Sequence, residues 1–165
     1  MIDEKSGSSI ENQLREQGLP TPYTSGLCIQ GGNLLVQYST EVSEAERVYS
    51  LPGAILRWGQ RARDILRKEF DEKYGMEISV GRFIIILEDK FQRGKDRVHQ
   101  INLIFEVKAT TTEFAIRAFG VGLKWIDINE LDRYNFQTLE LRDVIFNQSI
   151  HRLKHLIGGD LKFVK

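Results

Sequence analysis

LPGAILRWGQRARDILRKEFDEKYGM, residues 51–76, is the most informative segment of the sequence. After a Pro-Gly break, apolar side chains recur three and four residues apart, which predicts an amphipathic helix over residues 61–74 that ends at Gly75. The apolar positions are Ala62, Ile65, Leu66 and Phe70. Glu69 and Lys73 fall on the same predicted face, so a carboxylate and an ammonium group interrupt the stripe that is expected to face the core.

The segments on both sides of this helix have the pattern of β-strands. Residues 24–30 and 33–39 flank the Gly-Gly pair at 31–32, which is the turn chemistry of a hairpin. After the helix, residues 76–91 and 96–109 are rich in β-branched and aromatic residues and predict a second, longer hairpin. This order of elements predicts a mixed sheet with helices packed on it.

The two ends of the sequence have their own patterns. Residues 1–22 are polar and predict a leader, either mobile or a loosely docked helix, ahead of a domain over residues 23–165. Residues 121–128 predict a further strand, and Asn129 is expected to cap a short helix after it. Residues 139–156 have helical apolar spacing and predict a C-terminal helix.

The composition is that of one globular domain. A chain of 165 residues with 41% hydrophobic content is able to fill a single core. Lys plus Arg and Asp plus Glu both number 23, so no net charge recruits DNA, RNA or an anionic membrane. The longest apolar run, FIIIL, is too short to span a bilayer, and a cytoplasmic location is expected. The single cysteine, Cys28, lies in an apolar run and is expected to be a buried thiol.

The helix and the loop before it resemble the Nudix box, whose pattern is G-x5-E-x7-R-E-U-x-E-E-x-G-U, where U is a bulky aliphatic residue. Glu69, Glu72 and Gly75 match this pattern, and Phe70 and Met76 keep hydrophobic character. The positions that differ hold Ala54, Gln60, Lys68 and Lys73. The strand VHQINLIF and the segment LKWIDINEL also resemble Nudix segments, and they occur in the same order.

The resemblance implies a fold and an activity. The fold is a Nudix-type α/β/α sandwich around a mixed β-sheet. The activity is hydrolysis of a nucleoside diphosphate linked to another group, so the partner is a nucleotide-type small molecule and the cofactor is Mg²⁺ or Mn²⁺. Homodimers are common in the family, so a homodimer is allowed. The alternative, from a different class, is a non-catalytic module that binds a nucleotide, a sugar nucleotide or a protein partner through the same cleft.

A metal-dependent hydrolase of this kind needs several oxygen ligands, because the ion must neutralise phosphoryl charge and activate water. Glu69 and Glu72 are three residues apart on one predicted helical face, and Glu88, at a strand end, is a third candidate ligand. Gln60 and Lys73 stand where the family has acids. Binding of Mg²⁺ or Mn²⁺ is therefore expected to be weak or lost.

Two interpretations of Lys73 stay open. Lys73 follows Glu69 by four residues, the order that favours an ion pair, and its ammonium group would then lie near the place of the metal ion. In the other interpretation, Lys73 extends into water and Glu69 holds an ion.

Four residues are candidates for contacting substrate. Arg57 is the best candidate for phosphate, because a guanidinium group binds phosphate bidentately and this loop is expected to approach the substrate. Trp58 offers a ring for stacking on a base or sugar. Gln60 and Gln100 carry amides at positions where the family has, or often has, acids.

The histidines are interpreted mainly as structural or exposed residues, with a general-base role for His99 as the alternative. His99 is expected to make a local hydrogen bond on its strand. His151 and His155 lie four residues apart on the predicted tail helix, a spacing that suits Zn²⁺, but no third ligand is near them in the sequence and solvent exposure is expected.

Overall fold

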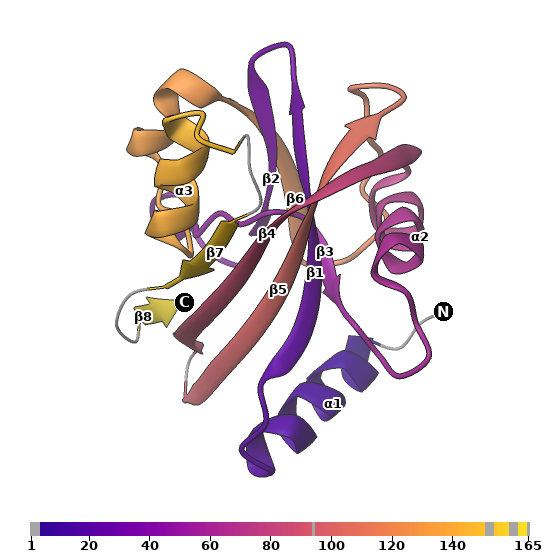
Figure 1. Ribbon diagram of the computed structural model, residues 1–165, viewed down its shortest axis with the longest axis vertical. Coiled ribbons are helices and arrows are strands. Elements are labelled where there is room, and N and C mark those ends of the chain that lie inside the picture. The colour runs from indigo at the N-terminus through magenta and orange to yellow at the C-terminus, as the bar shows by residue number, and fades with distance from the viewer. Residues whose placement is uncertain (1–3, 94, 151–153, 159–161, 165) are drawn as a thin grey trace.

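The computed structural model describes residues 4–93, 95–150, 154–158 and 162–164. The helices are α1 (Glu4–Glu16), α2 (Ala62–Tyr74) and α3 (Leu139–Phe146), with short 3₁₀ helices η1 (Glu44–Glu46) and η2 (Ile128–Arg133). The strands are β1 (Thr21–Gln30), β2 (Asn33–Ser39), β3 (Gly53–Ile55), β4 (Ile78–Arg93), β5 (Asp96–Ala109), β6 (Val121–Asp127), β7 (Lys154–Ile157) and β8 (Lys162–Val164). Within the described residues these strands form one sheet in the order β6-β2-β1-β5-β4-β7, with β3 paired to β1 and β8 paired to β4 (Figure 1).

Both predicted hairpins are present. β1 and β2 are antiparallel around Gly31 and Gly32, whose positive φ angles of 57° and 77° form the turn. β4 and β5 form the longer antiparallel hairpin, and β1 runs parallel to β5. The sheet is therefore mixed, as the sequence predicts.

α2 has the amphipathic pattern and the ending that the sequence predicts. Leu66, Phe70 and Tyr74 are fully buried against one face of the sheet. Gly75 adopts the left-handed conformation with φ 61°, and the N–H of Met76 donates to the carbonyl of Phe70 at 3.0 Å. This is a Schellman arrangement, in which a glycine without a side chain closes the helix.

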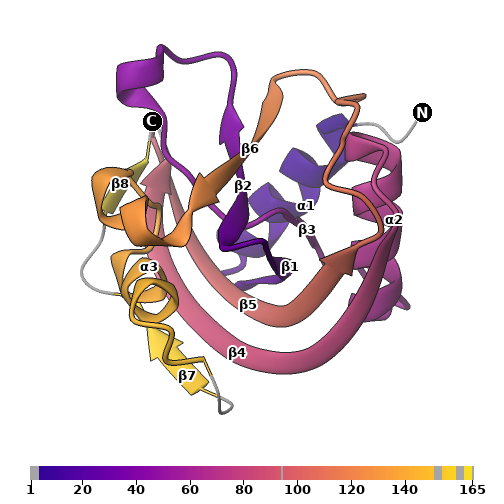
Figure 2. The same cartoon turned by 90° about the horizontal axis from the view of Figure 1, so that it is seen from above.

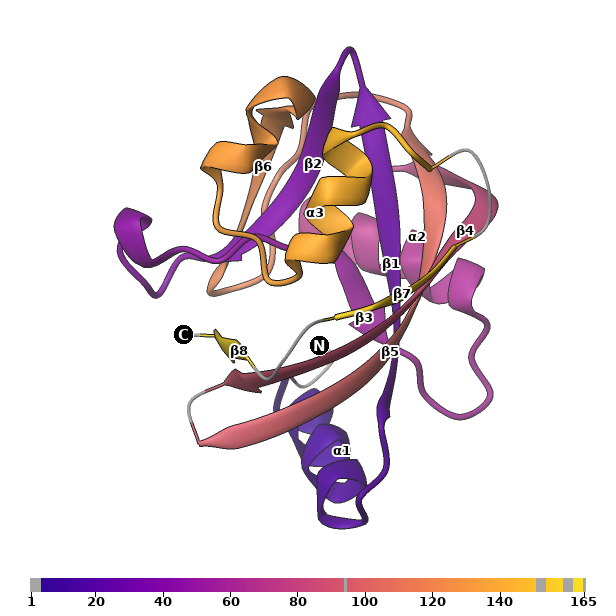
Figure 3. The same ribbon diagram turned by 60° about the vertical axis from the view of Figure 1, so that its left-hand side comes forward.

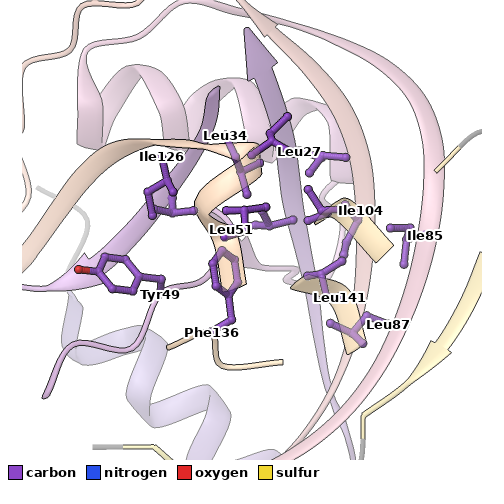
Figure 4. Close-up of a cluster of buried hydrophobic side chains, with 14 of the residues drawn as sticks. Leu27, Leu34, Tyr49, Leu51, Ile85, Leu87, Ile104, Ile126, Phe136 and Leu141 are labelled. Atoms are coloured by element: carbon purple, nitrogen blue, oxygen red, sulfur yellow. The ribbon is translucent and has the colours of Figure 1, made fainter. Parts of the chain in front are cut away.

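α3 covers the opposite face of the sheet. Its Leu141 and Ile145 join a buried cluster with side chains from β2, β4 and β5 (Figure 4). β2 supplies both sides by alternation, because Leu35 packs in the cluster with α2 whereas Leu34 and Val36 pack in the cluster with α3. The result is the predicted α/β/α arrangement, with α2 and α3 on the two sides of the curved β4 and β5 in Figure 2.

The C-terminal helix is shorter than the sequence predicts. α3 ends at Phe146, and residues 154–157 form β7, which pairs in parallel with β4. The prediction of a helix is therefore wrong for these residues. β7 satisfies backbone groups along β4 that would otherwise form an open edge, and this long-range pairing is not contained in the local apolar spacing. His155 lies on β7, and His151 lies outside the described residues.

The described part of the predicted leader, residues 1–22, contains a docked helix. α1 lies beside β1 and β5 (Figure 3), and Arg15 Nη1 is 3.0 Å from Asp96 Oδ1. At the predicted short helix after β6, η2, the cap is two residues earlier than expected. Asp127 caps η2 by accepting a hydrogen bond from the N–H of Asn129 at 2.8 Å, so the assignment of Asn129 as the cap is wrong.

The structure also describes the environment of the single cysteine and the character of the helices. Cys28 is fully buried, and burial raises the pKa of its thiol to about 11. Among the residues that the structure describes, no helix has the length and apolar character needed to cross a bilayer.

Candidate functional site

A cleft with a volume of about 1210 Å³ opens between the loop before α2 and the segment before α3. Strands β1 and β5 supply neutral side chains to its lining, whereas the helices and loops supply the charged ones. The charged residues among the described lining are Glu11, Arg57, Lys68, Glu69, Glu72, Lys73 and Arg117.

α2 presents different stripes to the core and to the cleft. The core-facing stripe is Leu66, Phe70 and Tyr74, and the cleft-facing stripe is Ile65, Glu69 and Lys73. Both stripes have four-residue spacing, and they are offset by one position, so they lie side by side along the helix. The charges that interrupt the predicted apolar face therefore belong to a separate stripe, which faces the cleft.

The Glu69 carboxylate and the Lys73 ammonium group form an ion pair in the cleft. The side chain of Glu69 is 12% exposed and that of Lys73 is 35% exposed, so the pair is partly withdrawn from water. Burial raises the pKa of the Glu69 carboxyl above its ordinary value, and the positive charge of Lys73 opposes this rise. The ion pair expected in one of the two interpretations of Lys73 is present.

The neighbouring polar side chains also have protein partners. Glu72 Oε1 lies 3.9 Å from Lys68 Nζ, and both of these side chains are about half exposed. Gln60 Oε1 accepts a hydrogen bond from the backbone N–H of Arg57 at 3.2 Å, which closes the turn before α2. The amide oxygen of Gln60, at a position where the family has an acid, therefore makes a hydrogen bond within the loop before α2.

These residues do not fit a divalent metal ion. Mg²⁺ prefers near-octahedral oxygen coordination that includes carboxylates. Within the described ranges, no group of three or more His, Cys, Asp or Glu side chains is placed to share an ion. The carboxylate of Glu69 instead contacts Lys73, and a protonated ammonium group cannot coordinate a metal.

Glu88, the predicted third metal ligand, lies outside the cleft lining. It is on the opposite face of β4, where one carboxylate oxygen is 3.6 Å from His99 Nε2 and the other is 3.4 Å from His155 Nε2. These contacts join β5 and β7 to β4 across the outer face of the sheet. The structure therefore does not bring Glu88 together with the acids of α2.

Asp89, the residue after Glu88, is the strand acid on the cleft side. It is 1% exposed, and the hydroxyl of Thr138 donates a hydrogen bond to its carboxylate. In the sheet register Asp89 lies opposite Gln100, which lines the cleft. Successive strand side chains point to opposite faces, so Glu88 and Asp89, although adjacent, lie on opposite sides of the sheet.

Three of the four predicted substrate contacts line the cleft. Arg57 and Gln60 do so from the loop before α2, and Gln100 does so from β5, where it is 6% exposed. Trp58 is fully exposed and is not part of the cleft lining.

Arg117 is a cleft residue that the sequence does not reveal. The loop 110–120 packs on the end of α2, where the N–H of Arg117 donates to the carbonyl of Lys73 at 2.8 Å and its Nη1 donates to the carbonyl of Asp71 at 3.2 Å. The last carbonyls of a helix lack intrahelical partners and attract a cation. No local motif in the loop signals this contact, because its partners are more than forty residues away in the sequence.

The charges of the cleft favour an anion. Of the charged side chains in the described lining, four are cations and three are carboxylates, and two of these carboxylates are paired with lysines of α2. Guanidinium and ammonium groups in a partly desolvated cleft bind phosphate through charge-assisted hydrogen bonds. A site for a divalent ion would instead have an excess of carboxylates over cations.

Comparison with known proteins adds information on the fold. No family model matches the sequence, and no curated protein matches it. An ADP-ribose pyrophosphatase from Streptococcus suis 89-1591 is 18% identical, with a TM-score of 0.58 over 87% of this chain and 98% of that chain. A UDP-X diphosphatase is 16% identical, with a TM-score of 0.61 over 94% of this chain and 76% of that chain. A NUDIX hydrolase from Nitrosomonas europaea is 9% identical, with a TM-score of 0.59 over 88% and 78% of the two chains.

These identities are low, so the likeness establishes the arrangement of the backbone. The shared arrangement agrees with the mixed sheet and the helices packed on it. The chain therefore has the Nudix fold.

Proposed function

We propose that the cleft binds the diphosphate group of a nucleotide-type ligand, and that cations of the chain, rather than a divalent metal ion, neutralise this group. The observation that supports the proposal is the ion pair between Lys73 and Glu69. It puts an ammonium group on the carboxylate that a metal-dependent hydrolase of this fold would need for its ion. Without an ion to neutralise charge and activate water, hydrolysis of the ligand is expected to be absent or very slow.

The cations converge on the cleft from three segments. Arg57 comes from the loop before α2, Lys73 from α2, and Arg117 from the loop 110–120. Arg57 is half buried and close enough to Glu69 for its charge to lower the pKa of that carboxyl. Two guanidinium groups and an ammonium group suit the several oxygens of a diphosphate, and guanidinium binds them bidentately.

The nucleotide part of the proposal is supported by proteins of the same fold. Two of them are named for action on nucleoside diphosphate compounds, as an ADP-ribose pyrophosphatase and a UDP-X diphosphatase. The chain covers 98% and 76% of their lengths, so the likeness in fold extends over most of both proteins.

A metal-dependent pyrophosphohydrolase is the second candidate function. Glu69 and Glu72 both line the cleft and are three residues apart on α2, and this placement favours it. That function requires Lys73 to leave Glu69 and an ion of Mg²⁺ or Mn²⁺ to replace it. Glu88 does not contribute, because it lies outside the cleft lining.

Calorimetric titration with ADP-ribose and UDP-glucose, first in EDTA and then with Mg²⁺ or Mn²⁺, tests the proposal. We expect binding in EDTA and no release of nucleoside monophosphate under either condition. Arg57→Ala should weaken binding by about tenfold, the effect of losing one charge-assisted contact. Arg67→Ala is the matched control, because Arg67 is exposed on α2, lies 3.1 Å from Asp64 and does not line the cleft.

The same experiment separates the two candidates. Binding that appears only after addition of metal, together with turnover that Glu69→Gln abolishes, would contradict metal-free binding and support the hydrolase. Binding in EDTA that Arg57→Ala weakens and Arg67→Ala does not would support the first candidate.

A further inference from the structure

The N-terminal helix α1 brings a carboxylate to the cleft. α1 lies at the same end of the sheet as the loop before α2 (Figure 1), and its Glu11 lines the cleft with the cations proposed to bind the diphosphate. The other carboxylates of the described lining, Glu69 and Glu72, belong to α2 and contact lysines of that helix. A carboxylate at the place of Glu11 attracts the cations of the cleft and repels the phosphate oxygens of a ligand.

α1 is packed less tightly than α2. Over residues 10–16, none of the side chains that the structure describes is fully buried, whereas α2 buries Leu66 and Phe70 completely. A pocket of about 130 Å³ lies between α1 and the first residues of β1 and β5, and Leu19 and Thr21 are among the residues that line it. Side chains that line a pocket instead of filling it make fewer packing contacts, so α1 should leave the sheet more easily than α2.

An ion pair and a short link attach α1 to the rest of the chain. Arg15 Nη1 lies 3.0 Å from Asp96 Oδ1, and the two side chains are 32% and 52% exposed. Exposed ion pairs of this kind contribute little to stability. Gly18, with a φ of 68° and open space beside its Cα, ends the turn after the helix. A glycine in this position permits α1 to swing about residues 18–20 without moving β1.

We infer that α1 is a lid on the cleft, which the Arg15–Asp96 ion pair and the attraction of Glu11 to the cleft cations hold closed and which a bound diphosphate displaces. The inference rests on the proposed function, because displacement requires an anion in the cleft. The docked helix and the ligand compete for the same cations, so each weakens the binding of the other by the same factor. The measured affinity is then the intrinsic affinity multiplied by the fraction of molecules in which the lid is open.

Arg15→Met tests the lid, because the lid and simple charge attraction predict opposite results. Removal of a cation near the cleft should weaken the binding of an anion if charge attraction alone acts. Loss of the pair with Asp96 instead opens the lid, so we expect ADP-ribose to bind about threefold more tightly in EDTA, as measured by calorimetry. Arg67→Met, which breaks the exposed pair with Asp64 outside the cleft lining, is the control and should leave the affinity unchanged. Unchanged or weaker binding by Arg15→Met would overturn the inference.

Glu11→Gln removes the charge that α1 presents to the cleft. We expect the affinity for ADP-ribose in EDTA to rise by about threefold, because the ligand no longer competes with a carboxylate for the cations. Glu16→Gln makes the same change at an exposed residue of α1 outside the cleft lining and should have no effect. An equal rise in both variants would contradict a specific role for Glu11 in the lid.

Hydrogen exchange detects the displacement of α1 directly. A helix of 13 residues is only marginally stable in water without tertiary contacts, so its amides should exchange faster once it leaves the sheet. We expect saturating ADP-ribose in EDTA to speed exchange over residues 10–16 of wild type and not over α2. Unchanged or slower exchange over residues 10–16 at saturation would show that α1 stays docked and would overturn the inference.

The failures of the two proposals are distinguishable. If wild type binds ADP-ribose in EDTA but neither Arg15→Met nor Glu11→Gln binds it more tightly, the lid is wrong and metal-free diphosphate binding stands. If neither wild type nor these two variants bind ADP-ribose in EDTA, the proposed function fails and the lid fails with it.

Discussion

Lys73 stands one helical turn after Glu69 on α2, and its ammonium group contacts the Glu69 carboxylate in the cleft. The order, with the acid on the N-terminal side, is the favourable one for a pair four residues apart. This pair differs from an exposed helical ion pair because the side chain of Glu69 is only 12% exposed. A carboxylate this buried requires a positive partner. If the partner is the ammonium group of Lys73, the place of a metal ion beside Glu69 is taken and the cleft favours an anion.

Lys73→Glu should create a metal site. The change removes the ammonium group and adds a carboxylate beside Glu69 and Glu72, which would supply several oxygen ligands on one helical face. We expect the affinity for Mn²⁺ to rise by about tenfold or more, as measured by calorimetry or paramagnetic broadening. Lys95→Glu makes the same change of charge at an exposed residue outside the cleft lining and should have no effect. Equal Mn²⁺ affinity in wild type and Lys73→Glu would show that Lys73 does not exclude the ion.

Glu69→Gln should change how stability depends on pH. Burial raises the pKa of Glu69 above its ordinary value of 4.5, so over the window above 4.5 the folded state holds a proton that the unfolded state releases. Glu69 therefore makes the free energy of unfolding fall as pH rises through that window. Relative to wild type, Glu69→Gln should gain stability between about pH 4 and about pH 7, as measured by urea unfolding.

Lys73→Met should strengthen the pH dependence of stability that Glu69 causes, as measured by the same urea unfolding. Lys73 opposes the rise in the pKa of Glu69, so its removal should widen the window in which stability falls with pH. A stability difference between Glu69→Gln and wild type that is the same at both pH values would contradict the assignment of a raised pKa to Glu69.

The elements specified by local signals were predictable from the sequence. The helix that ends at Gly75 follows from apolar spacing and a glycine stop, and the β1–β2 hairpin follows from Gly31 and Gly32. β7 was not predictable, because its residues have helical apolar spacing and become a strand only by pairing with β4, about seventy residues earlier in the chain.

The candidate site was predictable where local signals specify it and not where long-range contacts do. Arg57 and Gln60 lie in the recognisable loop before α2, and both line the cleft. The sequence alone could not show which acid of β4 faces the cleft side of the sheet. Glu88 and Asp89 are adjacent and face opposite sides, so the answer depends on the strand register. Arg117 reaches the cleft through long-range contacts with α2 that no local pattern encodes.

Tyr74→Phe should lower the stability of the fold by removing a buried hydrogen bond between α2 and β2. The hydroxyl of Tyr74 is buried and donates to Gln37 Oε1 at 2.7 Å, and Gln37 Nε2 in turn donates to Ser50 Oγ at 3.3 Å. Removal of the hydroxyl leaves the Gln37 acceptor without its donor, and we expect a loss of about 1–2 kcal/mol in the free energy of unfolding, as measured with urea. Tyr134→Phe, at a half-buried tyrosine in the cluster below α3, is the comparison and should lose less.

Gly75→Ala should affect both the fold and the cleft. The φ angle of 61° at Gly75 is strained for any residue with a Cβ, and an added Cβ would lie 3.2 Å from Arg117 Nη2. We expect a loss of about 1–2 kcal/mol in the free energy of unfolding from the strained helix end. Because the displaced guanidinium group belongs to the cleft, we also expect weaker binding of ADP-ribose in EDTA. Gly81→Ala, whose Cβ would make an ordinary 3.4 Å contact with the carbonyl of Glu106, should leave binding unchanged. A Gly75→Ala protein that loses stability but binds ADP-ribose as tightly as wild type would separate the helix end from the cleft and exclude Arg117 from the phosphate contacts.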